Sequence, residues 1–429
     1  MSAGQEMHRF IEEAYPLCRS LTGDGVRRTL AMIRERIPLE VREVPSGTPV
    51  FDWTVPREWN IRDAWIKDPA GRKVVDFQTC NLHVLNYSLP VHERLSLGEL
   101  KKHLFTLPEK PDLIPYRTSY YKEAWGFCLS HRAMLELPQG EYEVLIDSTL
   151  QDGFLTYGEC FLPGESEREV LLSTHVCHPS LCNDNLSGIA VMTWLARALA
   201  DRPRRYSYRF LFIPGTIGSI AWLARNEERT DRIVHGLVAA NLGVGAFHYK
   251  KSRRGDAEID RAVLHVLRTS GADFGVEDFV PFGYDERQYC SPGFDLPVGS
   301  LTRTPWGRYA EYHTSADNLD LVGPEALAGS LETYLRVVEI LEGNRRYLNL
   351  NPKCEPQLGR RGLYRMIGGD DAGRSRELAL LWVLNLSDGR HGLLDVAERS
   401  GMAFEAVRAA ADALLDVELL REMTEEETP

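Results

Sequence analysis

Residues 170–188 read VLLSTHVCHPSLCNDNLSG, and this stretch decides how the rest of the chain is interpreted. It opens on an apolar run typical of a buried strand and ends in Ser-Gly, ahead of a helical pattern. Between the two lie side chains able to bind a metal ion, namely His175, Cys177, His178, Cys182 and Asp184. Open α/β sheets build their ligand sites at the carboxyl ends of strands, where this loop begins. The stretch therefore predicts a strand, a metal-binding loop and a helix.

A second motif, Tyr312-His313-Thr314-Ser315-Ala316-Asp317, lies far along the chain. A hydrolytic metal needs neutral imidazoles and a carboxylate, with one position left for water, and His175, Asp184 and His313 can supply these ligands. We expect Asp317 to orient His313 from outside the ligand set. The alternative for either motif alone is a loop of hydrogen-bonded side chains without metal. The two motifs together favour a metal site.

The composition is that of a globular protein that does not bind polyanions. The chain has 429 residues, 43% hydrophobic and 26% charged, so we expect two or three domains. Its net charge of −12 argues against nucleic acid as a partner. No apolar run approaches the roughly 20 residues that span a bilayer, so no membrane association is expected. The N-terminus lacks the apolar segment of a signal peptide, and the cysteines are scattered; both features favour a cytoplasmic location.

The domain organisation follows from changes in pattern along the chain. Residues 1–37 are predicted to form two helices, and 38–164 an inserted β-rich module that covers one side of the site, with Tyr116–Trp125 as its most site-like stretch. Residues 1–37 and 165–350 together are assigned to an α/β domain with a mostly parallel sheet and helices on both faces. Strands are expected near 169–174, 208–213, 236–242 and 297–301, and helices near 187–200, 218–227, 257–270 and 324–341.

Residues 351–429 are predicted to form a winged-helix domain. Two helical segments, Leu393–Arg399 and Phe404–Leu415, have helix-turn-helix spacing, and Val417–Met423 can begin a wing. The second segment carries one arginine against several acids, so the phosphate contacts that DNA binding requires are missing. We therefore favour a packing or dimerisation module over DNA binding. The sequence leaves the oligomeric state open, a homo-oligomer included.

The stretches VLLSTHVCHPSLCNDNLSGIAV (170–191) and EYHTSADNLDLV (311–322) resemble the zinc aminopeptidase superfamily. There the first His ends a strand, the Asp of an Asp-Asn-x-Ser-Gly turn contacts metal, and a Tyr-His-Thr near the end completes the site. More closely, the chain resembles aminopeptidase-like proteins with an inserted β domain and a C-terminal winged helix, often encoded among polysaccharide-biosynthesis genes. The resemblance covers nearly the whole chain, including FIPGTIGSIAWL (212–223), SRRGDAEIDRA (252–262) and GYDERQYCSPGFDLPVGSL (283–301).

The chain departs from that pattern at two matched positions. Co-catalytic aminopeptidases place a pair of acids after the second strand, whereas Phe212–Ser219 contains none; the next strand usually ends in another metal-binding Asp, and Ala240–Gly245 lacks it. A two-metal centre is therefore not expected. The ligands that the resemblance leaves in place imply one Zn²⁺ per chain, held by His175, Asp184 and His313. Whether His175 or His178 is the first ligand stays open, although the strand end favours His175.

The general base and the substrate contacts must then come from other residues. Asp285, Glu286 and Glu311 are candidates for the base, and we select Glu286. His178 and Tyr312 are predicted substrate contacts. Arg287 can bind a substrate carboxylate or phosphate through two parallel hydrogen bonds, or else it pairs with a nearby acid for structural reasons.

These observations favour a mononuclear zinc-dependent, aminopeptidase-like hydrolase that acts on an amide or peptide-like bond of a small substrate. The resemblance alone implies that this substrate belongs to polysaccharide or amino-sugar metabolism. The missing acids support an alternative, a catalytically impaired metal-binding pseudoenzyme with a scaffolding or ligand-binding role. A winged-helix regulator with a ligand-sensing domain is disfavoured by the acidity of the chain. Acyl transfer of the glutaminyl-cyclase type on one zinc is a minor variant. The substrate itself cannot be deduced from the sequence.

Overall fold

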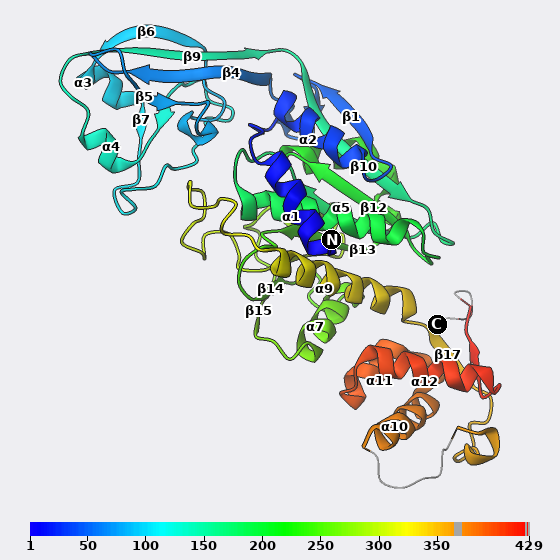
Figure 1. Ribbon diagram of the computed structural model, residues 1–429. Helices are drawn as coiled ribbons and strands as arrows, with labels where there is room; N and C mark the ends of the chain where they lie inside the picture. Colours follow the sequence, from blue (N-terminus) through cyan, green and yellow to red (C-terminus); the bar gives the residue numbers. More distant parts are fainter. Residues whose placement is uncertain (364–370, 425–426, 428–429) are drawn as a thin grey trace. The chain divides into compact units, whose positions relative to one another are not determined.

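The computed structural model describes residues 1–363, 371–424 and 427 and has a mixed α/β fold (Figure 1). The chain divides into two compact units, residues 1–257 with 274–332 and residues 258–273 with 333–429, and each is described by itself. Within the described ranges, none of the helices combines the length and the apolar character needed to cross a bilayer.

The first unit is built on a large sheet of eight described strands. Their order is β1 (Glu40–Pro45), β10 (Phe154–Leu162), β12 (Ser207–Ile213), β11 (Glu169–His175), β13 (Ile233–Ala240), β16 (Val298–Thr302), β14 (Phe247–Lys250) and β15 (Phe274–Glu277). The central strands β12, β11, β13 and β16 are parallel, whereas β1 and β10 at one edge and the β14–β16 pair are antiparallel. Every residue of β11 is buried, as a near-continuous apolar strand in the middle of a parallel sheet requires.

The helices of this unit are α1 (Ala3–Ala14), α2 (Asp24–Arg34), α5 (Gly188–Ala200), α6 (Ile217–Asn226), α8 (Glu286–Tyr289) and α9 (Pro324–Gly343), of which α9 continues into the second unit. Helix α5 packs on β11, β12 and β13, and α1 packs on α5, with the Phe10 and Trp194 rings 5.9 Å apart. Helix α1 begins with a capping box in which the Ser2 and Gln5 side chains satisfy each other's backbone N–H groups. The predicted α/β fold class is confirmed.

A second, antiparallel sheet carries the inserted module, in the order β5 (Lys73–Asp76), β4 (Glu58–Lys67), β9 (Glu141–Gln151) and β6 (Val91–Ser96). Shorter elements accompany it: β2 (Pro49–Val50), β3 (Trp53–Thr54), β7 (Leu104–Phe105), β8 (Phe127–Cys128), α3 (Leu97–Leu100) and α4 (His131–Leu135). Two segments expected in this module, β1 and β10, pair instead in the large sheet. Alternation of apolar residues predicts that a segment is a strand, but it does not name the strand's partner.

The second unit contains α7 (Glu258–Thr269), α10 (Asp371–Leu386), α11 (Leu393–Ser400) and α12 (Phe404–Asp416), with the strands β17 (Arg346–Asn349), β18 (Asp388–Gly392) and β19 (Leu420–Glu422). The predicted helix-turn-helix pair corresponds to α11 and α12, which are joined through Gly401 at a positive φ of 71°. Strand β19 lies in the segment predicted as a wing and pairs with β17. Two acids of α11, Asp395 and Glu398, are held by Arg261 of α7.

His235 of β13 gives the first unit a pH-dependent stability. Burial, helped by the charges of Arg168 and Arg205, lowers the pKa of His235 to about 3, and neither ring nitrogen has a hydrogen-bond partner among the residues that the structure describes. An unfolded histidine binds a proton below about pH 6.5, whereas the folded His235 does not. We therefore expect His235 to lower the free energy of unfolding by about 1.4 kcal/mol for each unit by which the pH falls from 6 to 4. Urea unfolding at several pH values should show that the free energy of unfolding falls less steeply in acid for His235→Leu than for wild type. An equal pH dependence in the two proteins would contradict the prediction.

Candidate metal centre

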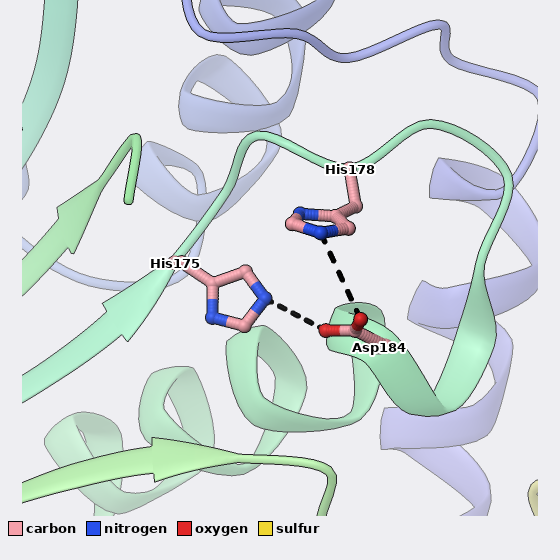
Figure 2. Close-up of side chains that lie close together, drawn as sticks. All are labelled: His175, His178 and Asp184. Carbon is pink, nitrogen blue, oxygen red and sulfur yellow. Dashed lines mark hydrogen bonds and ion pairs between the residues drawn. The ribbon is translucent and has the colours of Figure 1, made fainter. Parts of the chain in front are cut away.

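Four side chains from the two motifs converge at the carboxyl end of β11. His175 is the last residue of β11, His178 lies in the loop that follows, and Asp184 begins the turn into α5 (Figure 2). His175 Nε2 lies 2.8 Å from Asp184 Oδ1, and His178 Nε2 lies 3.7 Å from Asp184 Oδ2. His313 belongs to the second motif, far along the chain, and its Nε2 lies 3.0 Å from Asp184 Oδ2. Three imidazoles thus face one carboxylate that is 3% exposed.

The loop that carries Asp184 is held by side chains on both sides. Asn185 donates to Thr174 Oγ1 and to the His175 carbonyl, which fixes the turn against the end of β11. Asp317 accepts hydrogen bonds from the backbone N–H groups of Asn183 and Asp184, at 2.6 and 3.0 Å. Our expectation that Asp317 orients His313 is therefore corrected: it anchors the backbone of the Asp184 loop. Spacing along the chain placed Asp317 near the site but did not reveal its partner.

The charges of the cluster suit metal binding. Burial by itself would raise the pKa of Asp184, but His178 together with hydrogen bonds from His175 and His313 outweighs it, so that this pKa lies well below its ordinary range. Burial lowers the pKa of His178 to about 3, against the opposing attraction of Asp184. An ionised carboxylate beside a neutral imidazole is the protonation state in which these groups bind a cation.

The spacing of the donor atoms fits a small divalent ion. Donors about 2.1 Å from a tetrahedral zinc are separated from one another by about 3.4 Å. The nitrogen–oxygen separations of 2.8, 3.0 and 3.7 Å in the cluster bracket that value. Ligand atoms of His175, His178 and Asp184 all lie within 4.8 Å of one another. Imidazole and carboxylate donors in this arrangement are typical of zinc.

The place of the missing acid pair is filled by an aromatic ring. A Cβ atom on Gly215 would lie 2.0 Å from Cε1 of Tyr284, so no side chain fits there while the Tyr284 ring is in place. The Tyr284 ring packs 4.2 Å from that of His175, and its hydroxyl lies 3.2 Å from the Cys177 sulfur. At the end of the next strand, β13, the segment Ala240–Gly245 also carries no acid. The structure therefore explains why Gly215 carries no ligand.

The structure separates the two neighbouring acids of the α8 segment. Glu286 is 2% exposed and ion-paired with Lys250 at 2.8 Å, and it also accepts the backbone N–H of Tyr284. Asp285 is fully buried; it accepts a hydrogen bond from Ser219, and no described residue forms a hydrogen bond with its Oδ2. Burial raises the pKa of Asp285 to about 6, and the nearby His175 is among the groups that oppose the rise. The described partners of Glu286 are therefore Lys250 and the Tyr284 backbone, and not the histidines of the cluster.

Aromatic side chains surround the histidines. Tyr116, which lies in the stretch singled out in the inserted module, packs 5.1 Å from His178 and 5.0 Å from His313. The Tyr312 ring stacks on His313, with centroids 3.9 Å apart. Tyr284 was not predicted as a site residue; the only signal was its place two residues before the proposed base. Arg287 lies farther out, in the wall of a cavity that Tyr284 also lines.

Comparison with protein families decides the membership of this chain. Residues 8–344 match the model of a family described as a domain of unknown function, DUF4910. The chain belongs to this family. Residues 345–422 match a winged helix-turn-helix family, which confirms the predicted C-terminal winged helix.

Individual relatives extend this result. The chain is 56% identical, over 97% of its length and 96% of the relative's, to a Clostridium acetobutylicum protein named "Putative polysaccharide biosynthesis protein with aminopeptidase-like domain". The crystal structure of a putative peptidase from Clostridium acetobutylicum is 54% identical, with a TM-score of 0.93 and coverage of 98% of this chain and 96% of that one. BSAP, a zinc aminopeptidase from Bacillus subtilis, has a TM-score of 0.57 at 14% identity and covers 79% of this chain and 94% of its own. The last match shows a shared fold and confirms the resemblance at that level.

Proposed function

We propose that the chain is a single-zinc hydrolase that cleaves an amide or peptide-like bond of a small substrate in polysaccharide or amino-sugar metabolism. The observation that carries the proposal is the convergence of three imidazoles on the buried carboxylate of Asp184, at the end of a central parallel strand. The aminopeptidase-like fold supports hydrolysis of this bond type, and the name of the Clostridium acetobutylicum relative supports the metabolic context.

His175, Asp184 and His313 are the proposed ligands of one zinc per chain. Bound zinc would acidify a water molecule and polarise the substrate carbonyl. The chain's own contribution is to keep Asp184 ionised, to fix its loop through Asp317, and to exclude bulk water by burial. His178 and Tyr312 are the proposed substrate contacts beside these ligands.

Glu286 stays our predicted general base. Asp285 is the alternative, and it is favoured by its Oδ2 atom, which has no hydrogen-bond partner among the described residues. The two are separated by Asp285→Asn and Glu286→Gln. Loss of a general base lowers kcat by about 10²–10⁴-fold and removes the corresponding limb of the pH–rate profile. The variant that loses that limb identifies the base, whereas a purely structural role would change stability and leave the shape of the profile intact.

Metal analysis and chelation test the proposed activity. We expect about one zinc per purified chain. We also expect hydrolysis of aminoacyl or N-acyl-amino-sugar amides that stops on chelation and returns when one equivalent of zinc is added. Two zinc ions per chain would contradict the proposed centre. Activity that persists after complete removal of the metal would contradict its proposed role.

The filled space at Gly215 and the absence of an acid in Ala240–Gly245 favour one alternative, a metal-binding protein that has lost catalysis. In that case zinc would bind with the same stoichiometry and stabilise the fold, yet no member of the amide panel would be cleaved. The panel and the metal analysis together therefore separate the two functions.

A further inference from the structure

A cavity of about 240 Å³ adjoins the histidine cluster. Its lining includes Trp53, Tyr120, Tyr121, Tyr284 and Arg287. Tyr284 separates it from His175, on whose ring it packs. On the other side, the Tyr120 hydroxyl lies 2.7 Å from that of Tyr116, whose ring packs on His178 and His313. A molecule bound in the cavity would therefore lie one aromatic layer from the proposed metal.

Arg287 is the charged residue of this lining. It makes no hydrogen bond or ion pair with a residue that the structure describes, and its Nε is buried without a hydrogen-bond partner. Two buried arginines of the first unit differ from it, since Arg19 donates to backbone carbonyls and Arg209 to two glutamates. Because a buried donor without an acceptor is unfavourable, Arg287 is suited to a ligand that supplies acceptors.

Asp285 is the neighbouring acid with which Arg287 would form a structural ion pair. Its carboxyl is fully buried and receives a hydrogen bond from Ser219 at 2.7 Å. In the part of the chain that the structure describes no ion pair joins it to Arg287. Burial raises the pKa of Asp285 and the guanidinium charge opposes that rise through space, but the hydrogen-bond donors of Arg287 remain available to the cavity. Two aromatic side chains of the lining are also only partly covered: Trp53 is 49% and Tyr121 55% exposed, and their ring centroids lie 5.6 Å apart with the planes tilted by 59°.

We propose that this cavity binds an anionic group of the substrate, a carboxylate or a phosphate, with Arg287 as its partner through two parallel hydrogen bonds. A planar guanidinium matches both kinds of oxyanion, and the exposed aromatic rings contact the apolar part that carries the anion. A second cavity of about 380 Å³ shares Trp53 and Ile220 with the first and gives room for a longer molecule. The inference deepens the proposed function, because it states what kind of substrate the same site accepts.

The test compares three ligands with a common ring: glucuronic acid, glucose 6-phosphate and glucose. Calorimetric titration of the whole protein, both zinc-loaded and chelated, should show that one or both anions bind at least about tenfold more tightly than glucose. The better of the two anions identifies the source of the charge. Arg287→Met should remove this preference in both metal states, and Arg287→Lys should retain part of it. Loss in the chelated protein shows that the arginine, and not the metal, selects the anion.

Two further variants control for folding and for general charge. Trp53→Ala should weaken all three ligands to a similar degree while the anion preference remains, because it removes a shared wall. Arg28→Met, at an exposed site of α2, should change nothing. Equal binding of the three ligands by wild type, absence of binding by all of them, or a preference that survives Arg287→Met overturns the proposal. Anion preference without any amide hydrolysis would uphold the cavity and reject the proposed reaction, so the two failures are distinguishable.

Discussion

Asp184→Asn should abolish both zinc binding and hydrolysis. The substitution keeps the size of the side chain but removes the negative charge that three imidazoles face within 2.8–3.7 Å. Changes outside a ligand set typically weaken metal binding about 10–100-fold, so the loss of a central ligand should exceed this range. Activity should fall at least about 10³-fold, since several kcal/mol of transition-state stabilisation depend on the metal.

The measurement is zinc content by mass spectrometry of metals after chelation and reloading, with hydrolysis of the amide panel in parallel. Asp320→Asn is the matched control, because Asp320 is an exposed acid three residues after the second motif and is not one of the proposed ligands. The control should bind zinc as wild type does. Full zinc content in Asp184→Asn would show that the cluster is not the metal centre and would remove the basis of the proposed activity.

Arg209→Met should be the most destabilising single change away from the site. Arg209 of β12 is 6% exposed and holds Glu169 at 2.6 Å and Glu159, which are 3% and 9% exposed. Removing the cation leaves two buried carboxylates without a partner, which costs about 3–5 kcal/mol. Because those carboxyls can then be neutralised by protonation, the loss should be largest near neutral pH and should shrink in acid.

Urea unfolding at pH 7 and pH 4.5 checks this expectation. Adding Glu159→Gln and Glu169→Gln to Arg209→Met should recover part of the loss, because the unpaired charges are removed. Arg62→Met is the control, since its pair with Asp147 lies at the surface and should contribute little. A loss of equal size at both pH values would mean that packing against Trp222 and Phe161, rather than charge pairing, is the main role of Arg209.

The periodicity of the sequence predicted the elements that position the site. Strands expected near 169–174 and 208–213 are β11 and β12, and the helix expected near 187–200 is α5. These predictions succeeded because burial in a parallel sheet demands a continuous apolar run, which is a local property. The two predicted metal motifs also come together, since His175 of the first and His313 of the second both contact Asp184. That they bind zinc stays a prediction.

Partners that are distant in sequence were decided by the tertiary structure alone. The apolar pattern of β10 does not reveal that it joins the large sheet, and the letters around Glu286 do not reveal that Lys250 neutralises it. Likewise, the sequence shows that Gly215 is not an acid. It does not show that the space beside Gly215 is filled by the ring of Tyr284, 69 residues away. Periodicity and motif spacing report which side chains a segment offers and which face it buries. What each side chain meets depends on packing between segments, and that is fixed only when the whole chain has folded.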